Sequence, residues 1–159
     1  MPTSSTRPSG ASKSHRLGVT VQYAVKTPHL PTPAQFRGWA RAALERDARI
    51  TLRIVGKREA RALNRRFRGK DRPTNVLSFT LQRTPRLEGD VALCAPVIAS
   101  EARAQGKTGA AHYAHLVVHG VLHLQGYDHV TERQARRMER LETRIVTGLG
   151  FPDPYKEQG

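Results

Sequence analysis

Three histidines at fixed spacings are the residues of this sequence whose types best suit metal chemistry. His119 and His123 are four residues apart, so on a helix both imidazoles lie on one face, one turn apart. Gly126 can end that helix because glycine readily adopts left-handed backbone angles. The turn then brings His129 back towards the first two histidines. Three converging imidazoles predict a metal site that keeps a fourth position open for water.

The residue after the first histidine limits what such a site can do. The spacing matches the H-x-x-x-H-x-x-G-x-x-H pattern of the metzincin zinc enzymes, which place a glutamate after the first histidine as general base. Gly120 occupies that position here. The pattern therefore predicts the metal geometry of those enzymes without the proton carrier that a peptidase needs.

A second set of ligands is possible because His115 lies one turn before His119. The three turns spanned by His115, His119 and His123 cover about 12 Å of helix axis, too far for the outer pair to share one ion. The set of His119, His123 and His129 is therefore favoured. His115 is left to support a ligand or to pack, and Asp128 to orient an imidazole or to cap the following helix.

The ligand type and the overall charge together indicate the chemistry. Imidazoles suit zinc first, with nickel, copper or iron also possible. Zinc held by three histidines lowers the pKa of its bound water to about 7 and can polarise a phosphoryl oxygen. The 159 residues carry a net charge of +14, which predicts a polyanionic partner, nucleic acid ahead of an acidic membrane. A phosphodiester is thus the expected substrate.

The positive charge is concentrated between residues 53 and 72, which hold nine basic and two acidic side chains. Such a stretch is either a solvated helix face or a surface that follows phosphates, and its density favours the second. An arginine close to the metal would stabilise the charge on a pentavalent phosphorus. The basic residues are Arg53, Lys57, Arg58, Arg61, Arg65, Arg66, Arg68, Lys70 and Arg72.

Length, hydrophobic periodicity and turn residues predict one compact domain built from both strands and helices. Cys94 is the only cysteine, so no internal disulfide forms, and we expect a cytoplasmic protein without a membrane partner. Gly89 is assigned to the loop that joins the third and fourth predicted strands. Strands are predicted at residues 17–25, 49–55, 75–81 and 90–94. Helices are predicted at residues 33–47, 57–67, 96–105 and, as the central helix, 110–125. A last helix is predicted to begin at the capping residue Thr131 and to run to residue 147.

The ends of the chain are predicted to be polar tails around that domain. Residues 1–16 contain no acidic residue and predict a disordered basic tail, residues 17–151 the domain, and residues 152–159 a polar C-terminal tail. Within the domain, the central helix is apolar nearly all round, which predicts burial. Its buried imidazoles need partners. No acid lies nearby on the same helix, so we interpret a metal as that partner.

Two blocks of sequence closely resemble the bacterial YbeY family of endoribonucleases and ribosomal RNA maturation factors. They cover residues 63–79, including Arg68-Gly69-Lys70-Asp71-Arg72-Pro73-Thr74, and residues 115–129 with the histidines. The resemblance extends over roughly residues 17–151 and implies an α+β fold, in which a small mixed sheet of about four strands packs with helices around a central metal-binding helix. It implies zinc, one ion per chain, on His119, His123 and His129, and a functionally important arginine at Arg68.

The resemblance also implies a role. It implies a single-strand-specific endoribonuclease in ribosomal RNA processing, including maturation of the 16S 3′ end, and in ribosome quality control, with RNA and the small ribosomal subunit as partners and no small-molecule substrate. We therefore expect Arg68 and the three histidines to be catalytic. The expected RNA-binding side chains are Arg65, Arg66, Lys70 and Arg72.

Two rival hypotheses remain at this point. One is a non-catalytic ribosome assembly factor whose zinc is structural, which a fourth ligand such as His115 or Asp128 would support. The other is a metallopeptidase, against which Gly120 and the positive charge argue. The sequence leaves open which RNA bond is cut and whether water or the 2′-hydroxyl of the RNA attacks.

Overall fold

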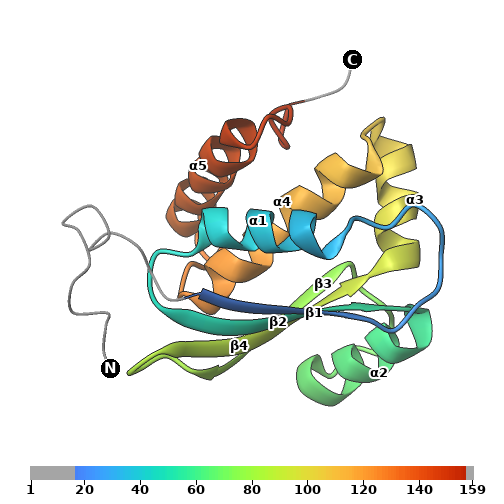
Figure 1. Ribbon diagram of the computed structural model, residues 1–159, viewed down its shortest axis with the longest axis horizontal. Helices are drawn as coiled ribbons and strands as arrows, with labels where there is room; N and C mark the ends of the chain where they lie inside the picture. The colour runs from blue at the N-terminus through green and yellow to red at the C-terminus, as the bar shows by residue number, and fades with distance from the viewer. Residues whose placement is uncertain (1–16, 157–159) are drawn as a thin grey trace.

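The computed structural model describes residues 17–156, which form five helices and one four-stranded sheet (Figure 1). The predicted basic tail, residues 1–16, lies outside the described residues. The strands are β1 (Leu17–Tyr23), β2 (Ala48–Val55), β3 (Val76–Gln82) and β4 (Leu87–Cys94). The helices are α1 (Pro33–Ala43), α2 (Lys57–Arg68), α3 (Ala95–Gln105), α4 (Gly109–Leu124) and α5 (Glu132–Gly148).

The sheet has the strand order β1-β2-β4-β3. The pairs β1 with β2 and β2 with β4 are parallel, whereas β3 runs antiparallel to β4 at the edge. The predicted α+β fold with a small mixed sheet is therefore confirmed. Within the described residues, no helix is both long and apolar enough to cross a membrane.

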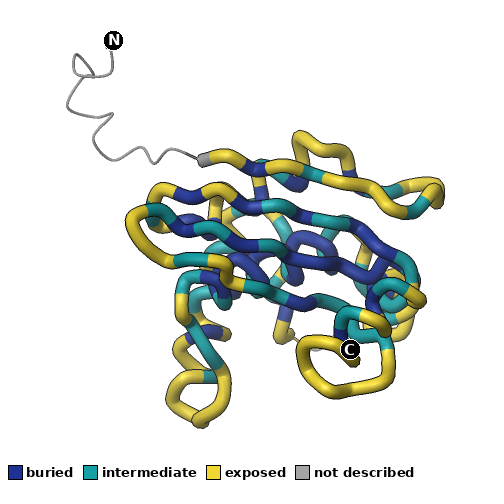
Figure 2. Tube along the Cα trace, turned by 90° about the horizontal axis from the view of Figure 1, so that it is seen from below, coloured by how far each residue is buried: buried dark blue, intermediate teal, exposed yellow. Residues whose placement is uncertain are grey.

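Side chains alternate between the two faces of the sheet, as the pleat of a strand requires. Figure 2 shows buried residues interleaved with less buried ones along the strands. In β2, Ile50, Leu52 and Ile54 are buried on the face that α1 and α4 cover, while Thr51 and Arg53 face the other side and are only half-buried. Figure 1 shows α1 and α4 above the sheet and α2 below it.

Helix α4 lies so close to the sheet that glycine is required at two contact points. A Cβ atom on Gly120 would lie 2.8 Å from Val91 Cγ1, and the Ser78 hydroxyl donates to the Gly120 carbonyl at 3.0 Å. A Cβ atom on Gly89 would lie 2.8 Å from both Leu124 Cδ2 and the Phe79 carbonyl oxygen. Because a Cβ does not fit there, a glutamate after the first histidine is sterically excluded.

Several predicted boundaries need correction. Strand β1 ends at Tyr23 rather than 25, and α1 ends at Ala43 rather than 47. The assignment of Gly89 to a loop was wrong, because β4 already begins at Leu87. Glycine normally weakens a strand, but here it permits the close approach of α4. The Thr131 cap is confirmed, with a reciprocal capping box to Gln134.

The segment after α5 contacts the domain. Phe151 packs edge-on against Trp39, with ring centroids 5.9 Å apart. The Lys107 ammonium donates to the Pro154 carbonyl at 2.9 Å, and the Tyr155 amide donates to Asp153 Oδ1 at 2.9 Å. Residues 152–156 of the segment that we predicted as a polar tail are thus held in place by named contacts. The division of the chain at residue 151 stays a prediction.

We predict opposite stability changes for two glycine-to-alanine substitutions. Gly89→Ala should lower the free energy of unfolding by about 1–3 kcal/mol, because the added methyl overlaps a backbone oxygen and Leu124. Gly38→Ala, in the middle of α1 with no atom within 4 Å of the new Cβ, should raise it by about 0.5–1 kcal/mol. Urea denaturation of both variants measures the difference, and equal effects would contradict the close packing of α4.

Candidate metal centre

The three predicted ligands line one cleft. His119 and His123 project from α4, and His129 lies in the connection between α4 and α5. The cleft measures about 530 Å³, and on its opposite side lie residues of α2, the loop after it, and β3. It is lined by Asn64, Arg68, Lys70, Arg72, Thr74, Val76, Leu77, Ser78, His119, His123, Asp128, His129 and Val130.

The turn after α4 places His129 beside the helical pair. Gly126 has a φ of +105°, which favours glycine, and the Tyr127 amide bonds back to the Leu122 carbonyl at 3.2 Å. The Thr131 cap then begins α5 two residues after His129. As a result the ring centroids of His119 and His129 lie 5.4 Å apart, and those of His123 and His129 lie 6.2 Å apart.

Hydrogen bonds set the tautomers of both helical histidines. Nδ1 of His119 lies 2.9 Å from Glu142 Oε2, and Nδ1 of His123 lies 3.0 Å from the Tyr127 carbonyl oxygen. Carboxylates and carbonyls only accept hydrogen bonds, so both Nδ1 atoms carry the proton. Each Nε2 atom is then left with a free lone pair, the form in which a neutral imidazole binds a metal.

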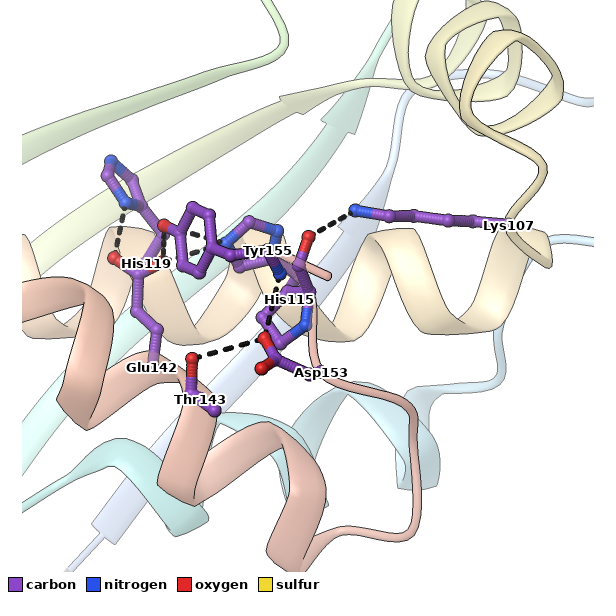
Figure 3. Close-up of polar contacts among 8 residues, drawn as sticks. Lys107, His115, His119, Glu142, Thr143, Asp153 and Tyr155 are labelled. Carbon is purple, nitrogen blue, oxygen red and sulfur yellow. Dashed lines mark hydrogen bonds and ion pairs between the residues drawn. The ribbon is translucent and has the colours of Figure 1, made fainter. Parts of the chain in front are cut away.

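Glu142 is the acceptor that two histidines on successive turns of α4, His115 and His119, share (Figure 3). The side chain comes from α5 and is 1% exposed. Its Oε1 accepts from Nε2 of His115 at 2.7 Å and from the Tyr155 hydroxyl, while its Oε2 accepts from His119. Burial alone would raise the pKa of Glu142, but the hydrogen bonds from His115, His119 and Tyr155 lower that pKa to about 2.

These contacts give the buried imidazoles protein partners that the sequence analysis did not anticipate, whereas the metal itself stays a prediction. We took a metal as their partner because α4 offers no acid nearby, but the acids come from other helices. Glu142 on α5 serves His115 and His119, and Glu101 on α3 accepts from His112 at 2.9 Å. One signal could have revealed Glu142: it lies between Met138 and Val146 at four-residue spacing, an acid on the buried stripe of α5.

The donor chemistry of the cleft fits a metal ion. Two imidazoles that bind one zinc at about 2.1 Å place their ring centres about 5 Å apart, near the 5.4 Å between His119 and His129. Among residues 17–156, no group of three His, Cys, Asp or Glu side chains is already closed around one point. The His129 ring lies nearly parallel to the other two, so that ring would have to turn for all three to converge.

The two residues considered for a fourth ligand have other contacts. Nε2 of His115 donates to Glu142, and the His115 ring lines a separate pocket on the far side of that carboxylate. Oδ1 of Asp128 accepts from the His129 amide at 2.8 Å and so stabilises the turn. His115 therefore influences the cleft only through Glu142, the carboxylate that also accepts a hydrogen bond from His119. The Asp128 side chain still borders the cleft.

The basic residues predicted to bind substrate divide into two groups. Arg68, at the end of α2, lines the cleft and donates to the Ser78 carbonyl at 3.3 Å, and Lys70 and Arg72 line the same cleft. The side-chain amide of Asn64 donates to the Arg72 carbonyl at 2.8 Å and holds this loop against α2.

Arg65 and Arg66 do not line the cleft. The guanidinium of Arg65 lies 3.9 Å from Asp71 Oδ1, and that of Arg66 lies over the Phe67 ring. Because consecutive residues of a helix point about 100° apart, a single helix could not turn all of these arginines towards the histidines.

Fold and cleft together define an α+β protein whose basic cleft faces a row of histidines. The model of the family described as Endoribonuclease YbeY matches residues 30–150. The chain belongs to this family, as the two sequence blocks predicted. The family identity also confirms the predicted enzyme class, an endoribonuclease.

Named relatives cover most of the chain. A protein of Methylobacillus flagellatus named Endoribonuclease YbeY is 54% identical over 143 residues, 90% of this chain and 96% of that protein. One of Nitrosomonas eutropha with the same name is 55% identical over 137 residues, 86% of this chain and 97% of that protein. The solution structure of TM1509 from Thermotoga maritima has the same fold, with a TM-score of 0.54 at 24% identity, covering 87% of this chain and 99% of that one.

We predict that His119 and His123 both populate the Nδ1–H tautomer in the metal-free protein at pH 8. Long-range proton–nitrogen NMR spectra of the imidazoles distinguish the two tautomers. In Glu142→Gln, one carbonyl oxygen replaces the two carboxylate oxygens that His115 and His119 use. The His119 signals should therefore shift towards the Nε2–H form, whereas His123, held by the Tyr127 carbonyl, serves as the internal control. Unchanged His119 signals would contradict this geometry.

Proposed function

We propose that this endoribonuclease is metal-dependent and single-strand-specific, and that it acts in the cytoplasm on ribosomal RNA. The proposed tasks are ribosomal RNA processing, including 16S 3′-end maturation, and ribosome quality control, with the small ribosomal subunit as partner. The single observation that carries the mechanism is that three histidines and Arg68 line the same cleft. In this arrangement, the histidines proposed to hold the metal and the arginine proposed to bind phosphate lie on opposite sides of one space.

His119, His123 and His129 would hold the metal, and zinc suits this donor set best. When bound, zinc supplies a Lewis acid that polarises a phosphoryl oxygen and lowers the pKa of a coordinated water. Glu142 keeps the proton of His119 on Nδ1, and the Tyr127 carbonyl does the same for His123. Such partners orient imidazole ligands and increase their basicity.

Arg68 is the residue proposed to bind the reacting phosphate. Its guanidinium is always charged and can form two parallel hydrogen bonds to phosphate oxygens. The bond to the Ser78 carbonyl holds it at the edge of β3, so the cation is positioned before substrate enters. A preorganised donor of this kind stabilises charge that develops in the transition state.

Lys70 and Arg72 extend the positive charge along the cleft on the loop after α2. We propose that they bind the phosphates next to the reacting one, which requires a strand without a pairing partner to enter the cleft. Arg65 and Arg66, outside the cleft, would contact the strand only after it leaves. Replacing one phosphate-binding side chain by alanine should reduce the salt dependence of RNA binding by about one counterion.

The test is cleavage of a single-stranded ribosomal RNA fragment by purified protein of known metal content. His123→Ala should lose both the metal and the activity. Arg68→Ala should keep the metal and lose about 100-fold or more in kcat, since it removes only transition-state stabilisation. Arg144→Ala removes the same charge from an exposed site on α5, outside the cleft, and should cut at the wild-type rate.

Analysis of the RNA ends in the same experiment identifies the nucleophile. A 2′,3′-cyclic phosphate means that the 2′-hydroxyl of the RNA attacks, whereas a linear phosphate end without that intermediate means water. If His123→Ala and Arg68→Ala, both folded, cut as fast as wild type, the proposed site is wrong. The protein would then be better described as a ribosome assembly factor with a structural metal.

A further inference from the structure

Two phenylalanine rings, one exposed and one half-buried, form a pair on the side of the sheet away from α4. Phe67, on the last turn of α2, and Phe79, on β3, have ring centroids 4.9 Å apart at an interplanar angle of 56°. Phe67 is 53% exposed, and the neighbouring Leu81 is 67% exposed. Large apolar side chains are usually buried, so the exposed Phe67 and Leu81 beside the half-buried Phe79 form an apolar patch of the kind that marks a binding surface.

The alternation of β3 fixes the side on which Phe79 lies. Its neighbours Ser78 and Thr80 bond to the α4 carbonyls of Gly120 and Leu124, at 3.0 and 3.5 Å. Successive side chains of a strand point to opposite faces, so Phe79 faces away from α4. There it borders a groove of about 430 Å³ whose lining includes Arg53, Arg66, Phe67, Leu81 and Asp90.

This groove adjoins the catalytic cleft. Phe67 precedes Arg68 in α2, and Phe79 follows Ser78 in β3. The Arg68 guanidinium donates to the Ser78 carbonyl, so one hydrogen bond joins the two residues next to the ring pair. The groove therefore begins one residue away from the cation proposed to bind the reacting phosphate. A strand that leaves the cleft across the edge of β3 would therefore pass the ring pair.

The charges of the groove suit a nucleotide with its base inwards. The Arg66 guanidinium lies 5.2 Å from the centre of the Phe67 ring, and among residues 17–156 it forms no ion pair with a carboxylate. Arg53 is paired with Glu59 at 2.6 Å. Asp90, opposite Phe79 in the sheet, is half-buried. A cation at the rim attracts phosphate, whereas a carboxylate on the floor repels phosphate and accepts hydrogen bonds from base amino groups.

We propose that the Phe67–Phe79 pair is a base-stacking subsite for single-stranded RNA, holding the base next to the phosphate that Arg68 binds. Aromatic side chains stack on bases of any sequence, and Arg66 binds the phosphate of the stacked nucleotide. The subsite rests on the proposed function, because it assumes that RNA occupies the adjoining cleft.

The test is RNA binding without cleavage. Fluorescence anisotropy in EDTA measures the Kd of a labelled single-stranded oligonucleotide for wild type, Phe67→Leu and Phe67→Trp. Leucine keeps an apolar side chain at this exposed position but removes the ring, so affinity should fall about tenfold. Tryptophan keeps a ring and should bind at least as tightly as wild type. Thermal unfolding checks that all three proteins are folded.

Abasic nucleotides locate the base that stacks. A series of oligonucleotides lacks one base at successive positions, and each is measured with wild type and Phe67→Leu. At the stacked position, loss of the base should weaken wild-type binding about tenfold and Phe67→Leu binding hardly at all, because both changes remove the same stacking interaction. Additive effects at every position would overturn the proposal.

The outcomes separate this subsite from the proposed function. If wild type neither binds nor cuts single-stranded RNA, the function itself fails and the subsite with it. If wild type binds and cuts but Phe67→Leu binds as tightly, the stacking proposal alone is wrong. The same conclusion holds if Phe67→Leu loses only the association with ribosomal subunits, because the ring pair would then contact the subunit and not the strand in the cleft.

Discussion

The buried carboxylate of Glu142 is the interaction on which the arrangement of the cleft depends. An uncompensated charge in a protein interior costs several kcal/mol, so Glu142 is stable at 1% exposure only because His115, His119 and Tyr155 all donate to it. Those donors belong to α4 and to the segment after α5, which Thr143 and Lys107 help to hold (Figure 3). One carboxylate thus ties three parts of the chain together and sets the proton position of a predicted metal ligand.

The second constraint on the cleft is the close approach of α4 to the sheet. It determines which side of the helix packs against the sheet and which side lines the cleft. Gly120 brings the helix backbone against Val91 and Ser78, which leaves the next face, with His119 and His123, open towards the cleft. The same contact leaves no space for a side chain where the metzincins have their glutamate. A peptidase base at position 120 is therefore incompatible with the close packing of α4 as it stands. The proposed chemistry then depends on groups across the cleft, among them Arg68, which donates to the Ser78 carbonyl at the edge of β3.

Both sides of β3 take part in this arrangement. Ser78 contacts α4 on the inner face and accepts from Arg68 at the edge, while Phe79 pairs with Phe67 on the outer face. The Ser78 carbonyl can accept from Arg68 because β3 is an edge strand. Its backbone forms hydrogen bonds to another strand, β4, along one edge only. The basic loop from Lys70 to Arg72 lies beside the same edge, held by Asn64. The proposed metal donors, the proposed phosphate-binding cations and the Phe67–Phe79 pair are consequently neighbours, although they come from distant parts of the sequence.

The sequence by itself determined the order and type of the elements, the capped start of α5, the spacing of the three histidines and membership of the family. These features are local: the helix period, cap residues and a glycine turn act within about ten residues. Only the tertiary structure decided that Glu142, Glu101 and Tyr155 serve the histidines, and that Lys70 and Arg72 line the cleft while Arg65 and Arg66 do not. It also decided that Gly89 belongs to a strand, because the reason for that glycine is the contact with Leu124 of α4. Such contacts join residues far apart in the chain, and no local pattern specifies them.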